Sequence, residues 1–288
     1  MHRRRTGPPC RSARTGARGV DSGAVHENSQ GPGPLPGDAE GGAWSGPEGA
    51  RAFAAVEAAT DWLLGYPFVF QELARRIGPG DLLIDYGCGP GTVADAAARR
   101  LGARVVGVDT SPQMLALARR TATAVAEYHL VEHGRVTGLP DGCADAVMCN
   151  HVLASVPTQE ALIAVLTEVR RLLRPGAPFV LLTTDPHCTG VTYASTRIGE
   201  AGQSPGVGEE FTVRLRRTDG TWQAVPNHAW PVDLFPALLH RSGFRDVTQR
   251  RPTVAEALTV ADPDLVHSRD WQAERARPPL VVTTAPAD

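Results

Sequence analysis

The sequence predicts an α/β protein with a doubly wound, mostly parallel seven-stranded sheet and helices on both faces. Two observations predict this fold. Between residues 78 and 185, short apolar runs of strand length alternate with amphipathic segments of helical length, and such alternation favours parallel strands joined by crossover helices. The first apolar run leads directly into a glycine-rich turn at residues 87–91, which is typical of the ligand-binding edge of an open α/β sheet.

The elements are expected in a definite order. A helical pattern from residue 51 is broken near Gly65, which predicts two short helices before the sheet. The core strands are expected at 82–85, 105–109, 128–131, 144–149 and 178–183, and the core helices at 91–101, 112–124 and 158–173. Beyond residue 184 we expect a hairpin of strands 211–216 and 222–225, a helix at 231–241, and the last two strands at 244–250 and 279–283.

Composition divides the chain into a tail and one domain. Residues 1–50 are rich in Gly, Pro, Ser and Arg with almost no apolar periodicity, so we expect a disordered tail. Residues 51–288 are expected to form the domain, with a cofactor-binding core at 78–185, an insertion or lid at 186–230, and C-terminal strands with a substrate-side segment at 231–288.

Charge and composition exclude several function classes. The formal net charge is −2 and no apolar run reaches the roughly 18 residues of a membrane helix, so we expect neither a nucleic-acid partner nor a membrane partner. All 29 basic residues are arginines, which excludes Schiff-base enzymes, Walker-type phosphate loops and dehydrogenases with a Tyr-x-x-x-Lys pair. The five cysteines form no C-x-x-C pair, so we expect no metal site and a reducing, cytoplasmic location.

The glycine-rich turn is flanked by two carboxylates. Asp85 precedes Gly87, Gly89 and Gly91, and Asp109 ends the next strand, 24 residues after Asp85. Glycines let a ligand approach the backbone closely, and an acidic residue at that distance suits ribose hydroxyls. The pattern therefore indicates a cofactor that contains adenosine.

A nicotinamide oxidoreductase is one alternative, and the details of the turn disfavour it. A dinucleotide fingerprint wants its third glycine at Thr92, whereas this chain has it at residue 91. Pro90 removes a backbone N–H from a loop that would hold a pyrophosphate. The Asp85 carboxylate would repel a pyrophosphate but suits an ammonium group near a sulfonium.

Four motifs follow one another in the core, namely Asp85-Tyr86-Gly87-Cys88-Gly89-Pro90-Gly91, Gly107-Val108-Asp109-Thr110-Ser111-Pro112-Gln113-Met114-Leu115, Leu139-Pro140 to Asp145-Ala146-Val147, and Leu172-Leu173-Arg174-Pro175-Gly176. Together they resemble the class I, or seven-stranded, S-adenosylmethionine-dependent methyltransferases, and in particular type 11-like enzymes that act on small molecules. The resemblance covers roughly residues 60–185. It implies a Rossmann-like fold with an antiparallel last strand and S-adenosyl-L-methionine as the cofactor.

The resemblance also implies which residues meet the cofactor. They are Tyr66, Asp85, Gly87, Cys88, Gly89, Gly91, Asp109, Thr110, Ser111, Met114, Gly134, Arg135, Val136, Asn150 and His151. The family often has an aspartate at the position of Arg135. Because arginine only donates hydrogen bonds, the adenine amino group would be bound by backbone or by another group.

Methyl transfer to an activated sulfonium depends mainly on alignment. An acceptor that must lose a proton also needs a base, and the candidates are His151, with His187 and Asp185 behind it. The alternative is that these three are ordinary strand-end and loop residues.

The expected function is methylation of an O, N or C atom of a small molecule, a bacterial secondary metabolite, by a monomer or homodimer. An S-adenosylmethionine-binding protein repurposed for another reaction or for regulation is the alternative from a different class.

Overall fold

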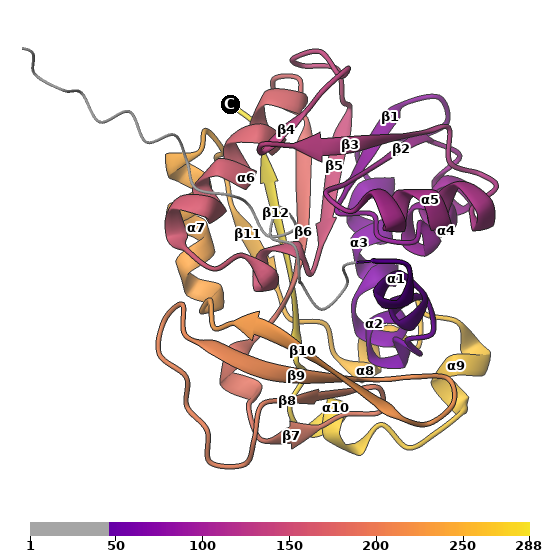
Figure 1. Ribbon diagram of the computed structural model, residues 1–288, viewed down its shortest axis with the longest axis vertical. Helices are drawn as coiled ribbons and strands as arrows, with labels where there is room; N and C mark the ends of the chain where they lie inside the picture. Colours follow the sequence, from indigo (N-terminus) through magenta and orange to yellow (C-terminus); the bar gives the residue numbers. More distant parts are fainter. Residues whose placement is uncertain (1–45) are drawn as a thin grey trace, which may run out of the picture. The chain divides into compact units, whose positions relative to one another are not determined.

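The computed structural model describes residues 46–288. Its main sheet has eight strands: β1 (Leu82–Tyr86), β2 (Arg104–Asp109), β3 (Glu127–Glu132), β4 (Arg135–Val136), β5 (Ala146–Asn150), β6 (Pro178–Thr184), β11 (Thr248–Arg250) and β12 (Leu280–Pro286). The order across the sheet is β11-β12-β6-β5-β1-β2-β3-β4 (Figure 1). Strands β3, β2, β1, β5 and β6 are parallel, whereas β12 runs antiparallel to both β6 and β11.

The predicted fold class is confirmed, including the antiparallel last strand. The predicted number of strands in the sheet was one too few. The difference is β4, a two-residue strand that folds back antiparallel on β3. The positive φ angles of His133 and Gly134, 48° and 76°, make this tight reversal, and a strand so short has no period-2 pattern to reveal it.

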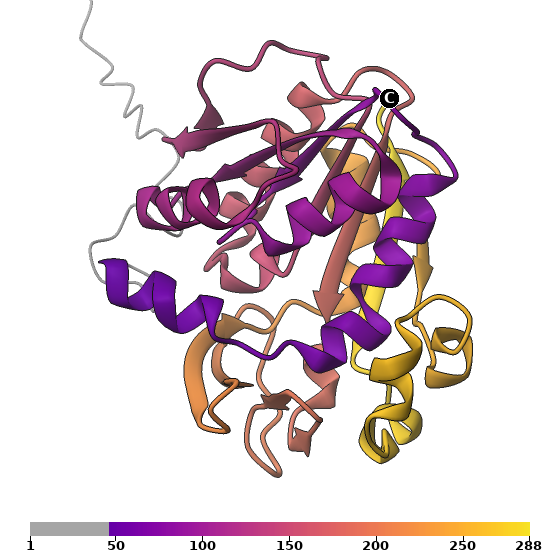
Figure 2. The ribbon, with the colours of Figure 1, turned by 90° about the vertical axis from the view of Figure 1, so that its right-hand side faces the viewer.

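Helices cover both faces of the sheet because successive strand residues point in opposite directions. Leu83 of β1 packs in a cluster with α3 (Tyr66–Ala74), α4 (Thr92–Leu101) and α5 (Pro112–Thr121). Its neighbour Ile84 packs in a second cluster, with α6 (Gln159–Leu172) and α7 (Phe235–Arg241). Figure 2 shows the indigo and purple helices lying across the first of these faces. The sheet is therefore buried on both sides, as a doubly wound fold requires.

The folded region begins earlier than the sequence predicted. Helix α1 (Gly46–Ala54) includes residues 46–50, which we assigned to the tail, and Ala50 is buried, with α1 packing on α5. The rest of the predicted tail, residues 1–45, lies outside the described residues. After α1 the chain forms α2 (Ala59–Leu64) and then α3, with the expected break at Gly65.

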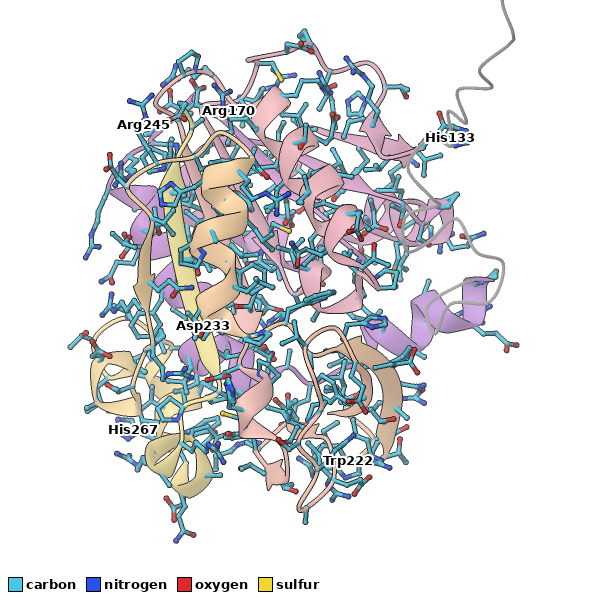
Figure 3. All side chains as sticks on the ribbon, turned by 90° about the vertical axis from the view of Figure 1, so that its left-hand side faces the viewer. His133, Arg170, Trp222, Asp233, Arg245 and His267 are labelled. Carbon is cyan, nitrogen blue, oxygen red and sulfur yellow. The ribbon has the colours of Figure 1, made fainter. Side chains whose placement is uncertain are left out.

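The predicted insertion forms a second sheet. Its four antiparallel strands, in the order β10-β9-β8-β7, are β7 (Val191–Thr192), β8 (Thr196–Ile198), β9 (Glu210–Arg216) and β10 (Trp222–His228). The last two form the predicted hairpin, and Figure 3 marks Trp222 on this sheet. This sheet has its own small apolar core, which includes Tyr193, Ile198 and Phe211.

The C-terminal part differs in detail from the prediction. Helix α7 begins only at Phe235, after a 3₁₀ turn η3 (Val232–Leu234), and of the expected strand 244–250 only β11 forms, with a single bridge from Phe244 to Ala287. Three short helices, α8 (Val254–Ala257), α9 (Pro263–His267) and α10 (Gln272–Ala276), lie between β11 and β12. Within residues 46–288, no helix is both long enough and apolar enough to cross a bilayer.

Candidate functional site

The turn after β1 depends on glycine. The φ angles of Gly87, Gly89 and Gly91 are +82°, +52° and +81°, a region that residues with a Cβ rarely enter. A Cβ on Gly87 would lie only 2.1 Å from Cγ2 of Val152. The N–H groups of Gly87 and Cys88 both donate to the carbonyl of Val108, at 2.7 and 2.9 Å. The loop is thus held against β2, with its backbone facing the carboxyl end of the sheet.

Asp85 is a buried carboxylate whose oxygens make no hydrogen bond of normal geometry with the described residues. It is 1% exposed. Burial, together with the negative charge of Asp109, raises the pKa of Asp85 to about 8, and the nearby Asn150 side chain only partly opposes this. The amide nitrogen and oxygen of Asn150 are also buried and without hydrogen-bond partners in this part of the chain. Since buried polar groups are normally satisfied, this pair at adjacent strand ends is a candidate for contact with a ligand.

Asp109 holds the glycine-rich loop and the start of α5 together. Its Oδ2 accepts the N–H of Gly89 and its Oδ1 accepts that of Ser111, both at 2.8 Å. Burial raises the pKa of Asp109, while these bonds and one from the Thr110 backbone oppose the rise. Ser111 in turn caps α5 by accepting the N–H of Met114 at 3.2 Å. Carboxylate oxygens have further lone pairs, so Asp109 can still accept ribose hydroxyls.

The predicted adenine-side residues lie at the β3–β4 corner, near the His133 turn marked in Figure 3. Gly134 takes the left-handed conformation and Arg135 is exposed. Val136 offers less than the prediction assumed, because its N–H donates to Glu168 at 2.8 Å and its carbonyl accepts from Arg171 at 3.3 Å. The backbone of Val136 is therefore already engaged by α6.

His151 follows β5 and lies beside two helices from the start of the domain. Its φ is +62°, an unusual conformation for a residue other than glycine, and its N–H donates to the carbonyl of Leu182 at 2.9 Å. Its Nε2 is 2.9 Å from Oδ1 of Asp61 on α2. The ring of Tyr66, from α3, meets the imidazole edge-on, with 6.4 Å between ring centroids. The structure thus places Tyr66 beside His151, which directly follows Asn150 in the chain.

The other two base candidates are arranged differently. Oδ1 of Asp185 accepts the backbone N–H of His187 at 2.9 Å and lies 3.0 Å from Nδ1 of the same residue, while Oδ2 accepts from Arg251 at 2.5 Å. These bonds lower the pKa of Asp185. The carboxylate caps the 3₁₀ turn η2 (Pro186–Cys188) and has both oxygens occupied, and the His187 side chain is 69% exposed. The carboxylate of Asp185 is therefore shared between His187 and Arg251.

Cys88 lies in the loop as a packing residue. It is 5% exposed, and burial raises the pKa of its thiol well above the usual value. A thiol kept protonated is a poor nucleophile, so the interpretation of Cys88 as a small buried side chain fits the structure.

Two residues near the site carried no signal in the sequence. Asp61 is an unremarkable acidic residue on a short helix, and Phe53 of α1 has its ring 3.4 Å from where a Cβ of Gly89 would be. Both come from segments before the motif region, and only the fold shows that they reach it. A hollow of about 450 Å³ between α2, α4 and α9 is a separate place, since no predicted site residue lines it.

The donor set fits S-adenosylmethionine. The unpartnered carboxylate of Asp85 suits an ammonium group, the amide of Asn150 can both donate and accept beside it, and Asp109 suits a ribose. The glycines between them carry no side chain, and Val152 and Tyr128 fill the space where side chains of Gly87 and Gly91 would lie. When bound, such a cofactor supplies a methyl group on a positively charged sulfur.

Comparison with known proteins agrees with this reading. Residues 84–181 match a family described as a methyltransferase domain. The chain is 31% identical over 210 residues to the N-demethylindolmycin N-methyltransferase of Streptomyces griseus, which covers 71% of this chain and 88% of that protein. It is 31% identical over 121 residues to a ubiquinone biosynthesis O-methyltransferase of Xanthomonas campestris, covering 41% of this chain and 49% of that protein. The crystal structure of an S-adenosylmethionine dependent methyltransferase from Mesorhizobium loti superposes with a TM-score of 0.51 at 23% identity, covering 79% of this chain and 97% of that one.

Proposed function

The chain belongs to the class I S-adenosylmethionine-dependent methyltransferases, and from this premise we propose that it methylates a nitrogen of a small molecule, a bacterial secondary metabolite. The choice of nitrogen is supported by the relative from Streptomyces griseus, which is an N-methyltransferase by name and is matched over most of its length. An oxygen acceptor is the second candidate, supported by the shorter match to an O-methyltransferase.

The observation that carries the cofactor site is the unsatisfied pair of Asp85 and Asn150 at the ends of neighbouring strands. In the proposed site Asp85 binds the ammonium group of the cofactor, the backbone at Gly87 and Gly89 lies along its methionyl part, and Asp109 accepts from the ribose. Asn150 lies on the side of the methyl group. Each of these groups is held by the sheet, so that alignment supplies most of the acceleration.

The acceptor is proposed to enter next to His151. The small sheet lies nearby, since β10 packs against the 3₁₀ turn η1 (Val152–Ser155) and Trp230 donates from Nε1 to the carbonyl of Val156 at 2.8 Å. These segments cover the carboxyl edge of the main sheet and would exclude water from the acceptor. His151 would take the proton that a nitrogen or oxygen acceptor must lose.

The test has a binding arm and a transfer arm. Calorimetry with S-adenosylhomocysteine should give binding that Asp85→Ala abolishes, whereas NADH should not bind. Incubation with methyl-labelled S-adenosylmethionine and a panel of small amines, indoles and phenols should label amines or indole nitrogens. Binding of NADH without binding of S-adenosylhomocysteine would overturn the proposed cofactor site. Labelling of phenols alone would show that the acceptor atom is oxygen and not nitrogen.

A further inference from the structure

We infer that Asp61 is the positioning residue of His151, orienting its ring and determining which ring nitrogen takes the acceptor's proton. This inference rests on the proposed role of His151 as the base. It adds a residue from α2, a helix that precedes the first sequence motif.

The contact joins two residues that are separately anchored. Oδ1 of Asp61 is 2.9 Å from Nε2 of His151, and the side chains are only 14% and 29% exposed. The main chain of His151 is bonded to Leu182 of β6. On the other side, α2 is tied down next to Asp61, because the N–H of Thr60 donates to Oγ of Ser195 at 2.9 Å. Two anchored groups lose little entropy when they pair.

Among the described residues, no arginine lies within salt-bridge distance of Asp61, and His151 is the only basic side chain that contacts its carboxylate. This contrasts with Asp185, whose carboxylate is occupied by Arg251 as well as by His187. The polar groups that face the imidazole are therefore Asp61 from α2 and Tyr66 from α3, with Asp85 of β1 beyond Tyr66.

The position of Nε2 decides the role of each ring nitrogen. Nε2 is buried, and the ring is turned so that its N–H does not yet point at Asp61 within hydrogen-bonding limits. Catalytic hydrogen bonds often align only in the substrate complex. A carboxylate beside Nε2 favours the tautomer with the proton on that nitrogen, which leaves the lone pair on Nδ1. Because Nε2 is buried, the acceptor cannot reach it. Nδ1 is therefore the ring nitrogen that takes the acceptor's proton.

The atoms and electrons of the transfer step then balance. A bond forms between the acceptor nitrogen and the methyl carbon while the carbon–sulfur bond breaks, and its electron pair stays on sulfur as a neutral thioether. The proton of the acceptor nitrogen passes to Nδ1, and the imidazolium is stabilised by the carboxylate of Asp61. Asp61 itself keeps its charge throughout, as an orienting carboxylate in a His–Asp pair does.

The test is the tautomer of His151, read by ¹⁵N NMR of histidine-labelled protein saturated with S-adenosylhomocysteine at about pH 8.5, well above the ordinary imidazole pKa. The spectrum of His151→Gln assigns the signal. We expect protonated Nε2 and unprotonated Nδ1 in the wild type, and loss of that preference in Asp61→Asn and Asp61→Ala. Both variants remove the carboxylate, so the test can be made even if only one of them folds.

A matched control separates orientation from loosening of the helix. Glu57→Gln weakens two ion pairs just before α2, with Arg216 and Arg269, without touching His151, and should leave the tautomer unchanged. Protonated Nδ1 in the wild type, or an unaltered ring in both Asp61 variants, would overturn the inference. Failure of the proposed function is seen separately, as absence of S-adenosylhomocysteine binding by the wild type, whereas the Asp61 variants should bind it within about twofold of the wild type.

Discussion

The backbone N–H of Gly89 donates to Oδ2 of Asp109 at 2.8 Å, so the carboxylate expected to bind the ribose also holds the glycine-rich loop in shape. A second N–H, that of Ser111, donates to Oδ1 of the same side chain. Hydrogen bonds to a charged group are each worth about 1.5–3 kcal/mol. Loss of Asp109 should therefore affect the loop even before any ligand binds.

Replacing Asp109 should weaken cofactor binding severely. We expect Asp109→Ala to lower the affinity for S-adenosylhomocysteine by at least about 100-fold, because the backbone amides of Gly89, Thr110 and Ser111 and the ribose lose their acceptor. Asp109→Asn should lose less, since its one oxygen can still accept one of the amides. Isothermal titration calorimetry measures both, with the exposed Asp233→Asn as the control. Unchanged affinity in Asp109→Ala would remove this residue from the site.

Cofactor binding should release a proton at neutral pH. With its pKa near 8, Asp85 is mostly protonated at pH 7 before binding, and an ammonium ligand favours the ionised form. The affinity should therefore rise as the pH approaches 8. Calorimetry at pH 7 in phosphate and in Tris should differ in enthalpy by the buffer ionisation of about one proton. Asp85→Asn should bind weakly and show no buffer dependence, and equal wild-type enthalpies in both buffers would contradict the prediction.

The same group should make the ligand-free protein less stable at high pH. The pKa of Asp85 is raised by folding from its ordinary value to about 8, so the folded state binds more protons than the unfolded state between these values. Stability from this residue is thus present at low pH and declines as the pH rises towards 8. Between pH 5 and pH 8, we expect the free energy of unfolding to fall by roughly 2 kcal/mol or more further in the wild type than in Asp85→Asn. Urea unfolding at both pH values measures this difference. An equal fall in the two proteins would show that Asp85 does not cause the decline.

Gly87 should not tolerate a methyl group. In Gly87→Ala the new Cβ would overlap Cγ2 of Val152 at 2.1 Å, at a φ of +82°. We expect a loss of about 2–5 kcal/mol in unfolding free energy, from the left-handed backbone and the overlap together. Adding Val152→Ala removes the overlap and should recover only the part of the lost unfolding free energy that the overlap causes, about 1–3 kcal/mol. Gly176→Ala, at a φ of +77° with nothing within 4 Å, is the matched control for the backbone part.

Glu168 should be essential for the β3–β4 corner. It is 6% exposed, accepts the N–H of Val136 and pairs with Arg171 at 2.6 Å. Glu168→Ala would remove one of the carboxylates that pair with Arg171 and would leave the N–H of Val136 without its acceptor. We therefore expect the free energy of unfolding, measured in urea, to fall by about 3–5 kcal/mol. The exposed neighbour Thr167→Ala should change it by less than about 0.5 kcal/mol. A loss below 1 kcal/mol for Glu168→Ala would show that the corner is held by other contacts.

The sequence predicted the central sheet and the glycine-rich turn well, because both leave local signals. Buried strands alternate with helices at regular spacing, and the turn from Asp85 to Gly91 needs glycines within a few residues of each other. Helix α5 likewise begins where Ser111 supplies a cap. These features depend on neighbouring residues and so can be read from a short stretch of chain.

The acceptor side was less predictable, because its contacts are made across long sequence separations. His151 was a candidate from its place after a strand, but its partner Asp61 comes from a helix whose sequence carries no motif. Asp185 and His187 had an equally favourable position after β6, yet Arg251, 66 residues later, occupies that carboxylate. Tertiary packing thus decides which distant residues each of these side chains contacts.

The place of β12 has a consequence for how the chain is made. Strand β11 bonds to no described strand of the main sheet other than β12, and β12 also pairs with β6. During synthesis, β11 therefore cannot join the main sheet until residues 280–286 have left the ribosome. The strands on either side of the glycine-rich turn can already associate by then. Until then the edge of β6 stays open, and the nascent protein is exposed to aggregation at that edge.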